Sequence, residues 1–112
     1  MPNLKENPTL KDYQQYIYDM EEHFGWLEHD LVKNCFFLGE EMGELFRAVR
    51  YVEKMGFDPK KEVENQNVAE ELVDVFNFLL GIANRLDIDM EQAFRDKNTK
   101  NMQRTWETPK GA

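Results

Sequence analysis

The chain has 112 residues, of which 41% are hydrophobic and 32% are charged. This composition is too apolar for a disordered chain and too charged for a membrane-spanning one, and the length fits one domain. We predict a single domain over residues 1–112, with a core over 8–106 and a frayed tail over 107–112. The formal net charge of -8 argues against binding to nucleic acid polymers or to anionic membranes, which would repel the protein.

The N-terminus has acidic residues and prolines where a secretory signal would have a basic and then an apolar stretch. No apolar run reaches the roughly 18 residues of a transmembrane helix. The single cysteine, Cys35, rules out an internal disulfide and a cysteine-based zinc site. These features together predict a cytoplasmic protein.

The first half of the chain shows two helical patterns. Thr9 is expected to cap a helix over about 10–24, which Gly25 then ends. After a short connection, apolar residues step by four and three positions over 31–52, which predicts a long second helix. A glycine and an Asp-Pro pair within 56–59 are expected to end it.

The second half of the chain continues the same pattern. A third helix is expected over about 62–85, and a fourth, capped by Asp87 or Asp89, is expected to run to about Gln103. No segment alternates with the period of a β-strand. We therefore predict an all-α fold, an antiparallel bundle of about four helices.

Carboxylates fall within the apolar stripes of the second and third helices. On a helical wheel, Glu41 lies inside the stripe of the second helix and Glu44 lies beside it. Glu71 and Asp74 repeat this arrangement, with the same i, i+3 spacing, on the third helix. Apart from Arg85, near its edge, no basic residue of these two helices clearly shares the arc.

Four unpaired carboxylates on one buried surface would repel one another, and each would cost several kcal/mol. A bound divalent cation resolves the conflict, and a ligand set made only of oxygen favours Mg²⁺ or Mn²⁺. The alternative is ordinary solvated helix surface. The equal spacing of the two clusters favours a metal site. Glu40, at the polar border of its helix, is a candidate to orient or deprotonate a water.

The order of these motifs resembles the MazG-like all-α nucleoside triphosphate pyrophosphohydrolases. The EExxE motif begins at Glu40, and the ExxD motif begins at Glu71. Two further features extend the resemblance over about residues 10–106. A tryptophan precedes the second helix, as in many members, and the fourth helix carries a sequence like the family's KxxxNxxR element. The residues that match these two features are Trp26, Lys97, Asn101 and Arg104.

The resemblance implies Mg²⁺-dependent hydrolysis of a nucleoside triphosphate, often a deoxynucleotide, to the monophosphate and pyrophosphate. Such an enzyme has a housekeeping role in the nucleotide pool. The resemblance also implies a homodimer or homotetramer whose sites take residues from more than one subunit. The residues that match the family's metal ligands are the four that the helical wheel selects: Glu41, Glu44, Glu71 and Asp74.

Substrate-binding roles follow for the remaining matches. Lys97, Asn101 and Arg104 lie at i, i+4 and i+7, so one face of the fourth helix presents two cations and an amide to a triphosphate. Without the family pattern, this face fits a solvated basic helix end equally well. Trp26 is a candidate to stack on a base, and packing beside a helix start is its alternative role.

A non-catalytic helical interaction module, with the acids as a docking face, is the alternative function. A di-iron carboxylate bundle is excluded because the Glu-x-x-His pairs that it needs are absent. The sequence does not specify the base or sugar of the substrate, and it leaves dimer and tetramer open.

Overall fold

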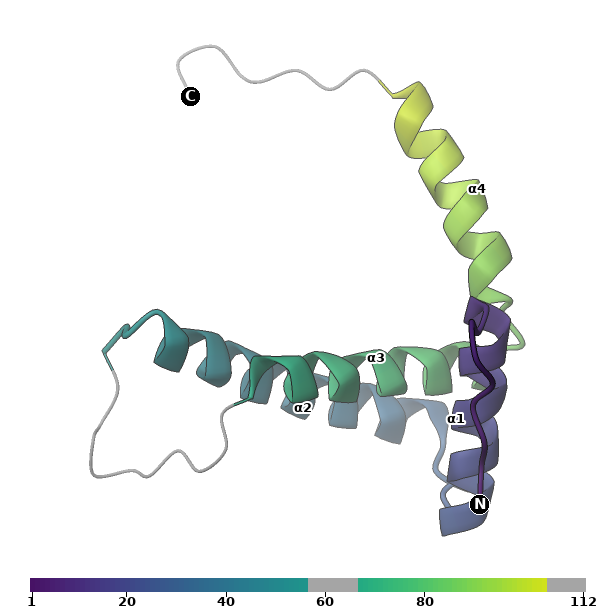
Figure 1. The fold of residues 1–112 in the computed structure, drawn as a ribbon, viewed down its shortest axis with the longest axis horizontal. Helices are drawn as coiled ribbons and strands as arrows, with labels where there is room; N and C mark the ends of the chain where they lie inside the picture. The colour runs from purple at the N-terminus through teal and green to yellow at the C-terminus, as the bar shows by residue number, and fades with distance from the viewer. Residues whose placement is uncertain (57–66, 105–112) are drawn as a thin grey trace.

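A computed structural model describes residues 1–56 and 67–104, and these residues form four α-helices and no strand (Figure 1). The all-α fold predicted from the sequence is confirmed. The helices pack against one another as a bundle. Their bounds are α1 Leu10–Phe24, α2 Leu31–Val52, α3 Val68–Arg85 and α4 Met90–Gln103.

Side-chain caps determine where the helices begin. Thr9 forms a capping box with Asp12: the Asp12 backbone N–H donates to the Thr9 hydroxyl at 3.2 Å, and the Thr9 backbone N–H donates to the Asp12 carboxylate at 2.8 Å. Asp89 accepts a hydrogen bond from the Gln92 backbone N–H and caps α4. Gly25 ends α1 with a left-handed φ of 74°, a conformation that favours glycine.

The third helix begins at Val68, later than the sequence pattern predicts. Asn67 has extended backbone angles, and its side chain accepts a hydrogen bond from the Glu70 backbone N–H at 3.2 Å, so Asn67 is the N-cap. Residues 62–66, where the first turns are predicted, lie outside the described residues, as do the Asp-Pro pair at 58–59 and the predicted frayed tail at 107–112.

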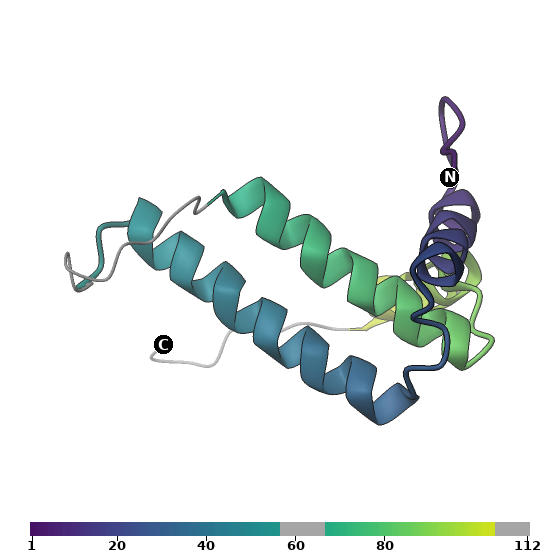
Figure 2. The same cartoon turned by 90° about the horizontal axis from the view of Figure 1, so that it is seen from below.

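The four helices form an open arrangement. α2 and α3 lie side by side and run antiparallel, and α1 crosses the pair at the C-terminal end of α3 (Figures 1 and 2). α4 packs against α1 and extends away from the α2–α3 pair. The Cα radius of gyration is 17.7 Å, whereas a compact chain of about 100 residues has about 13 Å.

Because the arrangement is open, one chain covers little of its apolar surface. The buried apolar side chains among the described residues are Ile17, Ala48, Leu80 and Ala83. Many large apolar residues of α2, α3 and α4 are exposed, with Phe36 at 71% and Met102 at 86% of full exposure. The other helices of the same chain therefore cover only part of the apolar stripe on each of these helices.

A buried amide network fixes the start of α4 against α1. The Gln14 side chain donates to the Asn84 side-chain oxygen at 3.1 Å and to the Ile88 carbonyl at 2.9 Å. In return, the Asn84 amide donates to the Gln14 carbonyl at 2.9 Å, and the Met90 backbone N–H donates to the Gln14 side-chain oxygen at 2.9 Å. Both ends of the Gln14 amide are satisfied, as a buried amide requires.

None of the helices in the described ranges combines the length and the hydrophobicity needed to span a bilayer.

Candidate functional site

The antiparallel packing of α2 and α3 brings together three carboxylates, here called the acidic cluster: Glu41, Glu71 and Asp74. Each offers one oxygen atom, and these three atoms lie within 4.8 Å of one another. Glu71 and Asp74 are one turn apart on α3, and Glu41 reaches them from α2. Glu41 and Glu71 are half-buried rather than fully buried, because α2 and α3 cover each other on one side only.

Glu44 lies at the edge of the acidic cluster. Its charge is close enough to raise the pKa values of both Glu41 and Glu71. The Glu44 carboxylate is 3.8 Å from the Arg47 guanidinium, one turn away on α2. Both side chains of this ion pair are well exposed, so it neutralises Glu44 only weakly. The structure therefore places this fourth predicted ligand beside the cluster.

The acidic cluster is electrostatically unfavourable in the absence of a cation. Partial burial is the main cause that raises the pKa of Glu41, followed by the charges of Asp74 and Glu71. The pKa of Glu71 is raised for the same reasons, with Asp74 as its strongest neighbour. Within residues 1–56 and 67–104, no basic side chain forms an ion pair with the three acids. Arg85 pairs with Glu21 of α1 instead.

The spacing and chemistry of the acidic cluster fit a hard divalent cation. Mg²⁺ binds oxygen ligands at about 2.0–2.1 Å, so two ligands on opposite sides of it lie about 4 Å apart. The 4.8 Å that bounds the three oxygen atoms is close to this separation. A donor set made of carboxylates suits hard cations such as Mg²⁺, Mn²⁺ or Ca²⁺.

Glu40 is exposed on α2, next to Glu41 in the sequence, and its charge contributes to the raised pKa of Glu41. Its carboxylate is therefore near the acidic cluster and open to solvent. This position is compatible with the role predicted for Glu40 toward a water molecule, which stays a prediction.

The predicted phosphate-binding residues lie on α4 and are not brought to the acidic cluster within one chain. Lys97 and Asn101 belong to α4, and Arg104 is its C-cap. α4 packs against α1 and extends away from the α2–α3 pair (Figure 1). Within one chain, these residues therefore lie apart from the acidic cluster.

Trp26 lies in the connection between α1 and α2. Its ring stacks on Phe24, with 4.7 Å between ring centroids and an interplanar angle of 23°. Trp26 is still 42% exposed. The predicted packing role is thus met on one side of the ring, and area remains for a base to stack on.

Aromatic side chains next to the acidic cluster were missed by the sequence reasoning. The Phe37 and Phe78 ring centroids are 5.8 Å apart, and His29 contacts Phe37 edge to face, also at 5.8 Å. Phe37 lies one turn before Glu41, and Phe78 lies one turn after Asp74. The available signal was their position on the helical wheel, on the same side of each helix as the acids.

An all-α chain with paired carboxylates on two antiparallel helices is the arrangement expected of the MazG-like all-α nucleoside triphosphate pyrophosphohydrolases. Within that class, the profile of the phosphoribosyl-ATP pyrophosphohydrolase family matches residues 11–101, and the chain belongs to this family. The resemblance found in the sequence is confirmed, and the family is one of pyrophosphohydrolases that act on nucleotide-like substrates.

Two relatives from Bacillus subtilis (strain 168) are similar to this chain. Uncharacterized protein YvdC is 33% identical over 100 aligned residues, which cover 81% of this chain and 93% of the relative. Uncharacterized protein YpjD is 44% identical over 57 residues, half of each protein.

Proposed function

We propose that the protein is a Mg²⁺-dependent pyrophosphohydrolase that cleaves a nucleoside or deoxynucleoside triphosphate to the monophosphate and pyrophosphate. The observation that carries the proposal is the acidic cluster: three carboxylate oxygens from two facing helices within 4.8 Å, without a basic partner among the described residues. Membership of a pyrophosphohydrolase family supports it. The proposed role is housekeeping of the nucleotide pool in the cytoplasm.

In this proposal, Glu41, Glu71 and Asp74 hold the cation, and Glu44 completes the set from its edge. A Mg²⁺ ion held by these acids would neutralise phosphate charge and lower the pKa of a water molecule bound to it. Glu40 faces solvent beside Glu41, where it can orient an attacking water and accept its proton. The acids thus hold the cation that neutralises charge, and Glu40 provides the base.

The phosphate-binding groups come from a second copy of the chain. Lys97 and Arg104 would bind the triphosphate and stabilise the leaving pyrophosphate, and Asn101 would add an amide hydrogen bond. A homodimer or homotetramer is supported by the exposed apolar surface of α2 and α3, on which Phe36, Phe46 and Leu72 are more than half exposed. Such a face is typical of an interface between subunits.

Trp26 is the proposed contact for the nucleobase. Its ring is partly exposed and is already held on one side by Phe24, so a base can stack on it with little ordering of the side chain.

The decisive experiment measures pyrophosphate release from a panel of ribonucleoside and deoxyribonucleoside triphosphates, together with phosphoribosyl-ATP, with Mg²⁺ and with EDTA. We expect a monophosphate and pyrophosphate from at least one substrate, and no product with EDTA. Glu41→Gln should be inactive, whereas the matched variant Glu22→Gln, at an exposed position on α1, should be fully active. Release of orthophosphate, or no reaction with any substrate, would contradict the proposal and favour a docking role for the acids.

A further inference from the structure

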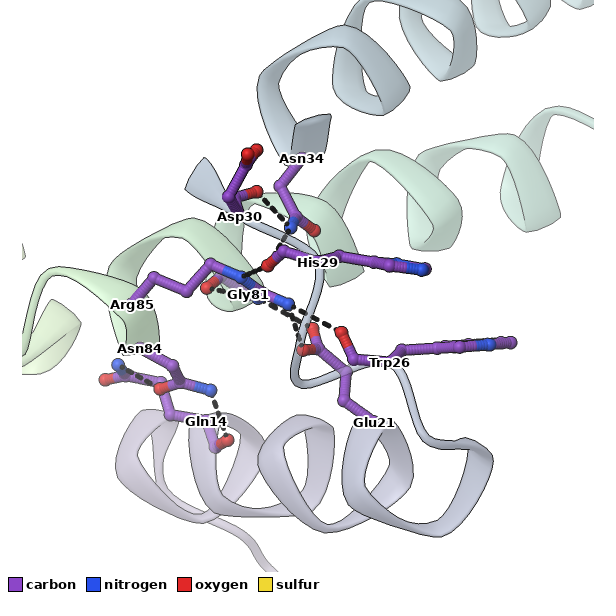
Figure 3. Close-up of polar contacts among 9 residues, drawn as sticks. All are labelled: Gln14, Glu21, Trp26, His29, Asp30, Asn34, Gly81, Asn84 and Arg85. Carbon is purple, nitrogen blue, oxygen red and sulfur yellow. Dashed lines mark hydrogen bonds and ion pairs between the residues drawn. The ribbon is translucent and has the colours of Figure 1, made fainter. Parts of the chain in front are cut away.

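The guanidinium of Arg85, in the last turn of α3, has an acceptor for each of its five N–H groups (Figure 3). Nε donates to the His29 carbonyl at 2.7 Å. Nη1 donates to Glu21 at 3.2 Å and to the Gly81 carbonyl at 3.0 Å. Nη2 lies 2.7 Å from the second Glu21 oxygen and donates to the Trp26 carbonyl at 3.1 Å. We call this set of contacts the Arg85 network.

The Arg85 network is largely removed from solvent. The side chain of Arg85 is 14% exposed, and that of Glu21 is 9% exposed. A buried ion pair adds little net stability, because the cost of desolvating both charges offsets their attraction. The network instead fixes the relative positions of its members, because the planar guanidinium of Arg85 binds the Glu21 carboxylate and two carbonyl groups of the connection between α1 and α2.

The backbone of α3 is shaped to admit Glu21. A Cβ atom added at Gly81 would lie only 2.6 Å from the Glu21 carboxylate and 3.3 Å from Nη1 of Arg85. A side chain at this position would therefore push the carboxylate away from the guanidinium. Glycine at position 81 lets α1 and α3 approach closely enough for the ion pair to form.

The network fixes the connection between α1 and α2, residues 25–30. Arg85 holds two of its carbonyl groups from α3. From α2, the buried Asn34 amide donates to the carbonyls of His29 at 3.3 Å and Asp30 at 2.8 Å. In Figure 3 the rings of Trp26 and His29 extend to the same side of the connection, away from Arg85. The backbone from which both rings extend is thus held on two sides.

The His29 ring links this connection to the acidic cluster. It contacts Phe37, which in turn contacts Phe78. Phe37 and Phe78 are each one helical turn from a carboxylate of the cluster, Glu41 and Asp74 respectively. A shift of the connection would therefore move aromatic side chains that flank the candidate metal site.

We propose that Arg85 is a positioning residue for substrate binding: held by Glu21, it fixes the backbone from which the rings of Trp26 and His29 extend. The Trp26 ring is the proposed base contact, and the His29 ring packs on Phe37, one helical turn from Glu41. This inference rests on the proposed function for its catalytic consequence. Its geometric part, the placement of Trp26, does not depend on that function.

The test replaces Arg85 with lysine, which keeps the charge but lacks the planar fork. The matched control is Arg50→Lys, because Arg50 donates to the Gly56 carbonyl at the far end of α2. Both variants are made in a Trp106→Phe background, so that Trp26 is the single tryptophan of the protein and its fluorescence can be followed alone. We expect Arg85→Lys to raise KM about tenfold with kcat nearly unchanged, and to increase acrylamide quenching of Trp26.

Gly81→Ala provides a second, independent variant, since it displaces Glu21 and leaves Arg85 intact. The same rise in KM and in quenching is expected, whereas Arg50→Lys should match the parent. A role in stability alone would lower the folded fraction, so kcat per total protein would fall while KM stayed constant; that result overturns the inference. If the folding of Arg85→Lys is impaired, Gly81→Ala decides by the same two measurements.

The two proposals fail in different ways. If the parent protein hydrolyses no nucleotide, the proposed function is wrong, and Trp26 quenching still decides whether Arg85 fixes the connection. If hydrolysis occurs but KM and quenching are unchanged in folded Arg85→Lys and Gly81→Ala, the positioning role is wrong and the proposed function stands.

Discussion

Glu41 on α2 and Asp74 on α3 place carboxylate oxygens within 4.8 Å of each other across a helix interface, although both side chains are acidic. Of the neighbouring charges, Asp74 contributes most to the raised pKa of Glu41. Folding therefore brings together two groups that oppose each other's ionisation. This costs stability in the metal-free protein, and the same two groups are the proposed ligands for a cation.

Removing one carboxylate from the acidic cluster should abolish activity without unfolding the protein. We expect Glu41→Gln and Asp74→Asn each to lower Mg²⁺-dependent hydrolysis by at least about a hundredfold, because each removes a direct ligand. The melting temperature of the metal-free protein should stay constant or rise, since like-charge repulsion is relieved. Calorimetric Mg²⁺ titration and thermal denaturation in EDTA measure the two effects. Full activity in either variant would contradict the site assignment.

The raised pKa values of Glu41 and Glu71 predict opposite pH dependences for stability and for metal binding. In the folded state both pKa values lie above the unfolded value of about 4.3, so the folded state binds more protons in the interval between. As pH falls through this interval, the acidic cluster destabilises the metal-free protein less, while protons compete with Mg²⁺ and weaken its binding.

Comparison with Glu41→Gln isolates this effect from other titrating groups, such as Asp12, whose pKa is lowered by its bonds to Thr9. The gain in melting temperature of the variant over the parent, both in EDTA, should shrink as pH falls toward the unfolded pKa of about 4.3. If this difference in melting temperature instead grew as the pH fell, repulsion by the neighbouring acids would not be what raises the pKa of Glu41.

The exposed apolar face of α2 predicts self-association at micromolar concentration. Burying a Phe side chain contributes about 1.5–3 kcal/mol, so Phe36→Ser should weaken association about ten- to a hundredfold. Lys33→Ser, at an exposed polar position of the same helix, is the matched control. Analytical ultracentrifugation across a concentration series measures both variants. A monomer at all concentrations, with full activity, would refute the prediction.

A shared site predicts complementation between inactive variants. Mixing Glu41→Gln with Arg104→Ala should restore up to about a quarter of parental activity, because half of the dimers are mixed and one of their two sites is intact. A mixture as inactive as its components, although subunits exchange, would show that each chain supplies its own phosphate-binding groups.

The α4 cations should act on phosphate rather than on metal. We expect Lys97→Ala and Arg104→Ala to lower kcat about a hundredfold, since cations near a leaving pyrophosphate stabilise charge that develops during the reaction. Their Mg²⁺ affinity, measured by calorimetry, should be close to that of the parent. Lys100→Ala, also exposed on α4, serves as the control. Loss of Mg²⁺ affinity as severe as in Glu41→Gln would contradict this assignment, as would unchanged kinetics in both variants.

Local chemistry made much of the fold predictable. Thr9, Gly25 and Asp89 act where the sequence predicts caps, because capping depends on residues within one turn of the helix end. The start of α3 was predicted about six residues before Val68, because Asn67 was not recognised as the N-cap that its bond to Glu70 makes it. The helical wheel selected Glu41, Glu71 and Asp74 because they share a face with apolar neighbours.

Relationships between distant segments could not be predicted from these patterns. Glu21 and Arg85 are 64 positions apart, and neither carries a local signal that names the other. Glu44 lies at the edge of the acidic cluster rather than within it, because a wheel angle ignores how two helices cross. The place of Lys97 relative to the acids depends on which helix α4 packs against, and sequence periodicity does not specify that.

The reciprocal hydrogen bonds between Gln14 and Asn84 have a consequence for how two copies of this chain would associate. Because the start of α4 is already anchored to α1, the arm that carries Lys97 and Arg104 has a set direction before any encounter. Association would then join two preformed surfaces, without coupled folding of the arm. The association rate constant should fall in the range of rigid docking, about 10⁵–10⁷ M⁻¹s⁻¹. A substitution that removes the Gln14 amide should lower this rate constant in a protein that is still folded.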